Sequence, residues 1–224
     1  MKVRAIAPIH LTAQELTRRQ RRYDALCPAG VEVRLDNLPA HDSVPRQLGS
    51  AEDIRASEAA VDTHIRSIST SDADVVLPDC VLDPGVRGRA DAPVPVRGIL
   101  ELAAGFAATL GLPFTAVARN EAIATELDAV IDHYELEGFS PTRVLHLSFE
   151  AIADETVWND AVTQMATAMA SSPVRTVLNG CSAVDVRDRS TGVTVFDPTR
   201  IALQLLGVAA SNALTLNTEV STHA

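Results

Sequence analysis

Short apolar segments alternate with longer segments of helical periodicity along most of the chain. The short segments are rich in β-branched residues, and some are apolar throughout, as expected for strands buried in a parallel sheet. They lie at residues 3–9, 31–38, 74–78, 94–97, 114–118, 143–148, 175–179 and 193–196. Strands that alternate with helices predict an α/β fold with parallel sheets.

Capping signals mark where several helices begin. Thr12 followed by Glu15, and Ser50 followed by Asp53, are typical of helix N-termini, while Asp197-Pro198 predicts an N-cap with proline at the first helical position. The remaining helices are predicted at 98–111, 121–134 and 151–170, and the last helix runs to about residue 214. Residues 81–95, which are rich in proline and glycine, predict a loop.

The charge balance excludes several classes of function. The 224 residues include 29 Asp+Glu against 19 Lys+Arg, a formal net charge of −10, which argues against nucleic acid as a partner. Lys2 is the only lysine, so a Schiff base in a pocket and a P-loop are both excluded. Apolar runs are too short for a membrane helix, and residues 1–9 do not resemble a signal peptide. We therefore expect a cytoplasmic protein that acts on a small molecule, with no membrane partner.

Three cysteines are present, at positions 27, 80 and 181. An odd number without close spacing fits neither a disulfide framework nor a cysteine-rich zinc site, and the histidines show no metal-ligand spacing. No metal and no cofactor are therefore expected.

Cys80 and Cys181 occupy equivalent places in two successive series of strands and helices, each shortly after a buried-type strand. Ligands of parallel sheets bind beyond the carboxyl ends of the strands, so two facing lobes would place one thiol on each side of a cleft. Two thiols can remove a proton from one face of a carbon and return one to the other face. Backbone amides beside the thiols could stabilise the enolate-like oxygen that forms.

The residues around both cysteines resemble a known superfamily. Residues 74–85 read DVVLPDCVLDPG, residues 95–101 read PVRGILE, and residues 177–182 read VLNGCS. With Phe196-Asp197-Pro198, this ordered set is similar to the Asp/Glu/hydantoin racemase superfamily, and most similar to its hydantoin racemase branch. The resemblance extends over nearly the whole chain.

This resemblance implies a cofactor-independent racemase, epimerase or isomerase that acts alpha to a carboxylate or carbonyl group, with Cys80 and Cys181 as the catalytic pair. It implies two flavodoxin-like lobes related by pseudo-twofold symmetry, with the active site in the cleft between them. Approximate lobes are 1–98 together with 199–224, and 99–198. A homo-oligomer is compatible with the resemblance.

Substrate-binding positions are predicted near the strand ends. They are Pro8, His10, Val81, Arg119, Asn120, Ser182 and Ala183. Several depart from the family pattern: the first strand ends Ala-Pro-Ile-His instead of Asn-Pro-Asn-Thr, and the strand before Arg119 lacks the usual hydroxyl pair. The substrate is therefore left open.

Alternative interpretations accompany these predictions. His10 is equally typical of a solvated loop, Arg119 of a salt bridge, Asn120 of a helix cap and Ser182 of a capped turn. Asp79 would raise the pKa of Cys80 unless it points away or meets a cation. Cys27 is interpreted as structural.

The function also has alternatives. A maleate-type cis–trans isomerase and an arylmalonate-type decarboxylase belong to the same superfamily, although the resemblance associates decarboxylation with loss of the first cysteine. A small-ligand-binding module without turnover would also fit the altered substrate positions.

Overall fold

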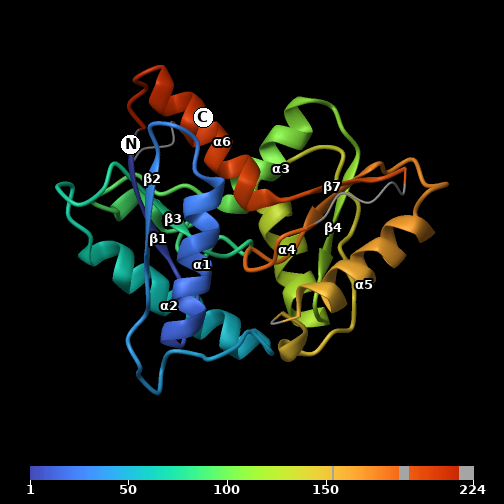
Figure 1. Ribbon diagram of the computed structural model, residues 1–224, viewed down its shortest axis with the longest axis horizontal. Coiled ribbons are helices and arrows are strands. Elements are labelled where there is room, and N and C mark those ends of the chain that lie inside the picture. The colour runs from blue at the N-terminus through green and yellow to red at the C-terminus, as the bar shows by residue number, and fades with distance from the viewer. Residues whose placement is uncertain (153, 187–191, 217–224) are drawn as a thin grey trace.

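Two parallel sheets form the centre of the molecule in a computed structural model that describes residues 1–152, 154–186 and 192–216. The first sheet has the strand order β2-β1-β3, and the second has the order β5-β4-β6-β7. The sheets lie in two lobes side by side, with α1 and α2 in the first lobe and α4 and α5 in the second (Figure 1). This confirms the predicted α/β class with two lobes; the exact lobe boundaries stay a prediction.

The first sheet is built from β1 (Lys2–Ile6), β2 (Glu32–Asp36) and β3 (Val75–Pro78). Every residue of β3 is buried, which explains its apolar sequence. Two helices belong to this series, α1 (Ala13–Leu26) and α2 (Ala51–Ser67). The predicted caps are present.

The second sheet consists of β4 (Phe114–Ala118), β5 (Arg143–Val144), β6 (Thr176–Asn179) and β7 (Thr194–Phe196). Its central strands β4 and β6 are fully buried and pair in parallel, with Val117 opposite Asn179. This register brings the residues that follow both strands to the same edge of the sheet.

Four further helices complete the α-helical structure of the described residues. They are α3 (Ile99–Thr109), α4 (Glu121–His133), α5 (Glu155–Ala168) and α6 (Pro198–Ser211). Two short 3-10 turns are also present: η1 (Arg89–Asp91) precedes α3 and η2 (Phe149–Ile152) precedes α5.

Three predicted elements differ from the structure. Residues 94–97 form only an isolated bridge between Val96 and Val76, because Pro95 has no N–H to extend a ladder. The strand predicted at 143–148 is limited to two residues. The helix predicted at 151–170 begins at Glu155, with η2 ahead of it.

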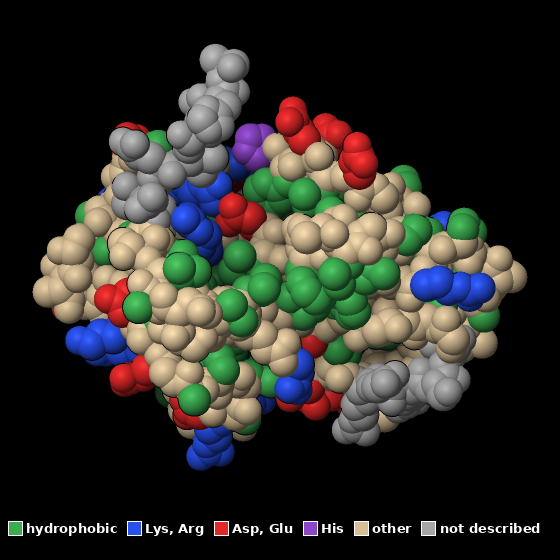
Figure 2. Space-filling model, turned by 90° about the horizontal axis from the view of Figure 1, so that it is seen from above, with side chains coloured by type: hydrophobic (Ala, Val, Ile, Leu, Met, Phe, Trp, Pro, Cys, Tyr) green, Lys and Arg blue, Asp and Glu red, His purple; other side chains and the backbone are tan. Residues whose placement is uncertain are grey.

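Apolar side chains gather on the face that is seen from above in Figure 2. The helices α3 and α6 pack against each other, and large exposed hydrophobic residues occur at Leu110, Val208 and Leu214. A homo-oligomer stays a prediction. Among the described residues, no helix is both long and apolar enough to cross a membrane.

Candidate active site

Cys80 and Cys181 lie on the wall of the same small cavity, of about 60 Å³. Cys80 follows β3 and Cys181 follows β6, so each thiol sits at the carboxyl end of a buried parallel strand. The cavity is lined by Pro8, Ile9, Arg19, Leu48, Cys80, Val81, Leu82, Arg119, Ile123, Phe149, Ile152, Gly180, Cys181, Ser182 and Ala183. The sequence prediction that residues after the strands of two lobes meet in one cleft therefore agrees with this geometry.

Each sulfur lies beside a backbone amide two residues further along the chain. The N–H of Leu82 donates to the sulfur of Cys80 at 3.5 Å, and a backbone hydrogen bond from Ala183 partly opposes the rise that burial causes in the pKa of Cys181. The two loops therefore present their thiols in the same local arrangement.

Asp79 is buried next to Cys80, but its carboxylate is held by other groups. It accepts hydrogen bonds from Arg19 at 3.0 Å and from the hydroxyl of Tyr23 at 2.8 Å. Arg19 also donates to Glu15 at 2.8 Å, and it lines the cavity. From the sequence we expected Asp79 to point away from Cys80 or to meet a cation, and the cation is Arg19 of α1.

Several bonds link the loop after β6 to the first lobe. The hydroxyl of Ser182 donates to the carbonyl of Asp79 at 2.9 Å, and Arg18 donates to the carbonyl of Ala183 at 2.8 Å. Arg22 pairs with Asp197, the N-cap of α6, at 2.7 Å. The bond from Ser182 joins the two cysteine loops directly, and the bonds from Arg18 and Arg22 fasten the second lobe to α1.

Asp83 organises the loop that carries Cys80. Its carboxylate accepts from the amides of Leu100 and Glu101 at 3.0 and 2.7 Å and from the hydroxyl of Tyr134 at 2.8 Å, so it caps α3 from outside the helix. Burial raises the pKa of Asp83 to about 7 despite these donors. A Cβ at Gly98 would lie 2.0 Å from this carboxylate, which explains why the helix start has no side chain.

The loop that carries Cys181 is fixed by Asn179 and Gly180. The side-chain amide of Asn179 donates to the carbonyl of Cys181 at 2.8 Å, while its oxygen accepts from Trp158 at 2.9 Å. A Cβ on Gly180 would lie 1.9 Å from the carbonyl oxygen of Val117, so this position admits no side chain at the present strand spacing.

The two thiols experience different electrostatic environments. Burial raises the pKa of Cys80 to about 12, and the carboxylates of Asp79 and Asp83 act in the same direction. Burial also raises the pKa of Cys181, but the positive charges of Arg19 and Arg22 oppose this increase. Cys181 is therefore the thiol with cationic stabilisation of its ionised form.

Five of the seven predicted substrate-binding residues line the cavity. They are Pro8, Val81, Arg119, Ser182 and Ala183. The hydroxyl proton of Ser182 is already donated to the carbonyl of Asp79, so the expected donation from Ser182 to a substrate would require this bond to break. The structure places neither His10 nor Asn120 on the cavity wall, in contrast to the prediction.

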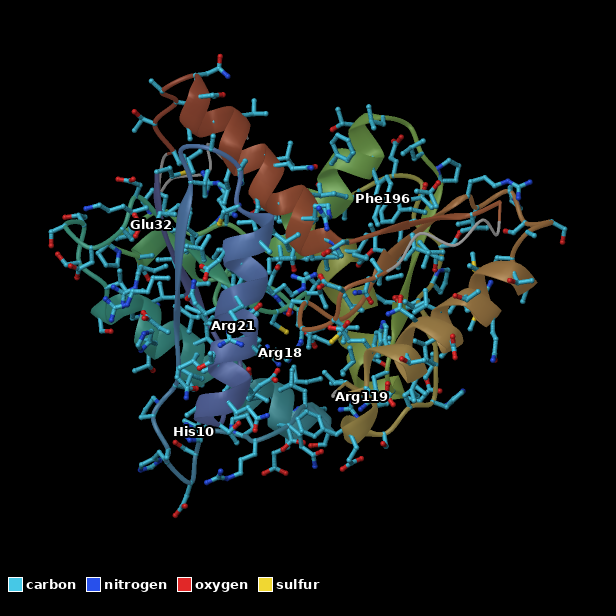
Figure 3. The ribbon with its side chains drawn as sticks, in the orientation of Figure 1. His10, Arg18, Arg21, Glu32, Arg119 and Phe196 are labelled. Carbon is cyan, nitrogen blue, oxygen red and sulfur yellow. The ribbon has the colours of Figure 1, made fainter. Side chains whose placement is uncertain are left out.

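His10 belongs to a neighbouring space. Its Nδ1 lies 2.7 Å from the carbonyl oxygen of Leu38, and its side chain lines an outer cavity of about 500 Å³. In Figure 3 it lies near the start of α1, away from Arg119. The inner and outer cavities share the wall residues Ile9, Arg19, Phe149 and Ile152.

Asn120 has a structural role in the described residues. Its side-chain oxygen accepts from the amide of Ile123 at 2.9 Å as the N-cap of α4, and its amide donates to the carbonyl of Leu48 at 3.3 Å. Asn120 therefore acts as a helix cap, which was the alternative interpretation of this residue in the sequence.

The sequence reasoning did not identify Arg19, Phe149 or Ile152 as site residues. Arg19 lies within a helix rich in arginine, where nothing in the sequence distinguishes it from its exposed neighbour Arg21 except its spacing of four from Glu15. Phe149 and Ile152 belong to a 3-10 turn, whereas the sequence predicted a connection at Phe149 and the start of a helix at Ile152. In the described part of the chain, no group of three or more His, Cys, Asp or Glu side chains is arranged to hold a metal ion.

The sequence matches the Asp/Glu/hydantoin racemase family over residues 12–206. The chain belongs to this family. No curated protein is significantly similar to it in sequence. Several solved structures resemble this chain in fold at low sequence identity. This similarity establishes the fold of the chain and not its reaction.

Allantoin racemase from Pseudomonas fluorescens has a TM-score of 0.82 and 18% identity, with 97% of this chain and 94% of that chain covered. An aspartate racemase homologue from Pyrococcus horikoshii has a TM-score of 0.61 and 15% identity, covering 94% and 99%. A variant of arylmalonate decarboxylase has a TM-score of 0.65 and 18% identity, covering 93% and 92%. These names describe different reactions, so the shared fold does not show which reaction this protein catalyses.

Proposed function

We propose that this protein is a cofactor-independent racemase or epimerase that acts on a carbon alpha to a carboxylate or carbonyl group. The observation that supports it most directly is that Cys80 and Cys181, which follow strands of different lobes, line one cavity of about 60 Å³. In a racemisation, the thiolate of one cysteine accepts the proton of the substrate carbon, and the thiol of the other donates a proton to the opposite face. The negative charge is held by the substrate oxygen in the meantime.

The surroundings of the thiols support this chemistry in two ways. The amides of Leu82 and Ala183 point at the sulfur positions, where they can also meet developing charge on a substrate oxygen. Arg19 and Arg22 favour ionisation of Cys181, while Cys80 stays protonated. Burial raises the pKa of both thiols, and Cys181 is the one whose ionisation the neighbouring charges favour, so we assign it the role of base and Cys80 the role of acid.

Deuterium incorporation tests the proposal. We expect the wild-type protein to exchange the alpha proton of at least one compound among aspartate, glutamate, hydantoin, allantoin and simple 2-substituted carboxylates in deuterated water, as followed by NMR. Cys80→Ala and Cys181→Ala should each lower the exchange by at least about 100-fold, the usual contribution of a general acid or base. Cys27→Ala, away from the cavity, is the matched control and should retain wild-type exchange. Exchange at the wild-type rate in both cavity variants would refute the two-thiol mechanism.

A cis–trans isomerase of an unsaturated dicarboxylate is the second candidate, because the unequal thiols also fit a nucleophile and a proton donor. The thiolate of Cys181 would add to the double bond while the thiol of Cys80 protonates the neighbouring carbon, and elimination would follow bond rotation. Maleate offered to the wild-type protein and quenched with acid during turnover should then yield a thioether at Cys181 detectable by mass spectrometry. Alpha-proton exchange in the wild type without any adduct would favour the racemase.

A further inference from the structure

Three arginine side chains of the described residues are buried, and one of them differs from the other two. Arg19 lies 3.0 Å from Asp79 and 2.8 Å from Glu15, and Arg22 lies 2.7 Å from Asp197. Arg119 is 6% exposed, yet no carboxylate of the described residues lies within ion-pair distance of it. A buried guanidinium without an anionic partner costs free energy, so its position requires an explanation.

The carboxylate of Glu150 acts on Arg119 electrostatically without forming an ion pair, and the groups that contact the guanidinium directly are uncharged. One Nη donates to the carbonyl oxygen of Leu48 at 2.7 Å, and the guanidinium carbon lies 5.6 Å from the centre of the Phe149 ring. Its Nε is buried with no hydrogen-bond partner. A guanidinium has five N–H donors in a planar fork, so most of its hydrogen-bonding capacity is left for a ligand.

Arg119 stands directly beside one of the thiols. Strands β4 and β6 pair with Val117 opposite Asn179, so Arg119 and Cys181 each come two residues after a paired position. Both side chains line the inner cavity. Figure 3 shows Arg119 on the second lobe, facing the side where Arg18 projects from α1. A group bound by Arg119 would therefore lie next to the carbon that the thiols reach.

We propose that the substrate is a small carboxylate whose carboxylate group is bound by the Arg119 fork, with its alpha carbon between Cys80 and Cys181. This inference rests on the proposed function and narrows it, because a neutral cyclic amide would leave the guanidinium unpaired. Planar bidentate pairing with a guanidinium favours a carboxylate, and Arg119 and both cysteines line the same cavity.

Arg119 would also contribute to the reaction itself. Removal of the alpha proton places further negative charge on the carboxylate oxygens, and the proton moves to one thiolate while the opposite thiol supplies its replacement. A guanidinium at these oxygens stabilises that charge more than it stabilises the ground state. Loss of Arg119 should therefore lower turnover as well as binding.

Two alkylating reagents of similar size but different charge test the carboxylate site without a known substrate. Iodoacetate carries a carboxylate and iodoacetamide a neutral amide. The ratio of their rates at Cys181, measured by peptide mass spectrometry, should fall about tenfold in Arg119→Gln, as expected for the loss of one charge-assisted hydrogen bond. Arg119→Lys should retain part of the preference, because it keeps the charge and loses the fork. Arg21→Gln, an exposed arginine of α1, is the control and should leave the ratio unchanged.

A second measurement does not depend on thiol reactivity. Propionate and propionamide have nearly the same shape, so at equal ionic strength propionate alone should raise the melting temperature of the wild-type protein. The increase should persist in Cys181→Ala and disappear in Arg119→Gln. If Arg119→Gln does not fold, Arg119→Lys should show a smaller increase than the wild type.

The outcomes separate the two proposals. An unchanged reagent ratio together with an unchanged propionate effect in the Arg119 variants would overturn the carboxylate site. Wild-type thiols that react with neither reagent would contradict the two-thiol chemistry, and the propionate effect would then decide the role of Arg119 alone. Equal stabilisation by propionate and propionamide would also overturn the carboxylate site.

Discussion

The loop after β3 and the loop after β6 each bring a cysteine to the cavity and an amide to its sulfur, yet their charged neighbours have opposite signs. Cys80 lies among Asp79 and Asp83, while Cys181 faces Arg19 and Arg22. The backbone is therefore similar on both sides, and burial raises the pKa of both thiols, whereas the charged neighbours reinforce this rise at Cys80 and oppose it at Cys181. Pseudosymmetry of the fold does not make the two cysteines chemically equivalent.

Among the substitutions that test the two cysteine loops, Gly180→Ala should have the largest effect. The new Cβ would meet the carbonyl oxygen of Val117, so β4 and β6 must separate. We expect a loss of about 3 kcal/mol in the free energy of unfolding by urea. Gly98→Ala should cost less, because its obstacle is the side chain of Asp83 and not a backbone atom.

Gly105→Ala is the matched control for these variants. No atom lies within 4 Å of the Cβ it would add, and the residue is in the interior of α3. The substitution should stabilise the protein by about 0.5–1 kcal/mol through helix propensity. A Gly180→Ala variant as stable as Gly105→Ala would contradict the close approach of the two strands.

The next effect concerns the acidity of Cys181. Arg19 lowers the pKa of this thiol against the larger effect of burial, so Arg19→Gln should raise the pKa. The pH profile of alkylation at Cys181 by iodoacetamide should then move to higher pH, and the rate at mildly alkaline pH should fall. Arg19→Lys should restore most of the profile, and Arg21→Gln should not change it. If Arg19→Gln does not move the pH profile of alkylation, Arg19 is not the cause of the difference between Cys80 and Cys181.

The smallest effect is expected from Tyr134→Phe on the Cys80 side. Removing the hydroxyl that donates to Asp83 should cost about 1 kcal/mol. The pKa of Asp83 is raised from 3.8 to about 7, so the native state binds the proton more tightly than the unfolded chain does. The stability that this proton contributes is complete at acidic pH and is lost as pH rises through about 7.

The control for this prediction is the pH dependence of the stability that Tyr134→Phe loses. The hydroxyl favours the ionised carboxylate, so its removal raises the pKa of Asp83 further and should destabilise the protein more above neutral pH than below it. Urea unfolding at several pH values measures this difference. An equal loss of stability at all pH values would indicate that Asp83 keeps one protonation state.

The sequence was informative wherever a local pattern determines the structure. The buried strands β3 and β6 could be recognised from apolar runs, and the fold class follows from their alternation with helices. The position of Cys80 and Cys181 after these strands predicted that they meet, since ligands bind beyond the carboxyl ends of parallel strands and two facing lobes share one cleft. Asn120 could be recognised as a cap for the same reason, although it was also assigned to the substrate.

The charged residues of the site could not be deduced in this way. Arg19 reaches the cavity because α1 packs so that this side chain meets Asp79, which is distant in sequence. His10 follows β1 as predicted, but its ring turns to the carbonyl of Leu38 and faces the outer cavity. Such orientations depend on the packing of both lobes, which no local pattern specifies.

The hydrogen bond from Ser182 to the carbonyl of Asp79 constrains how molecules reach the thiols. It joins the two cysteine loops directly, so the gap between Cys80 and Cys181 cannot widen from that end while the bond is intact. The outer cavity adjoins the inner one at another part of its wall, which is formed by Ile9, Arg19, Phe149 and Ile152. A molecule that entered from the outer cavity would pass these four side chains, so their size would limit what reaches the thiols.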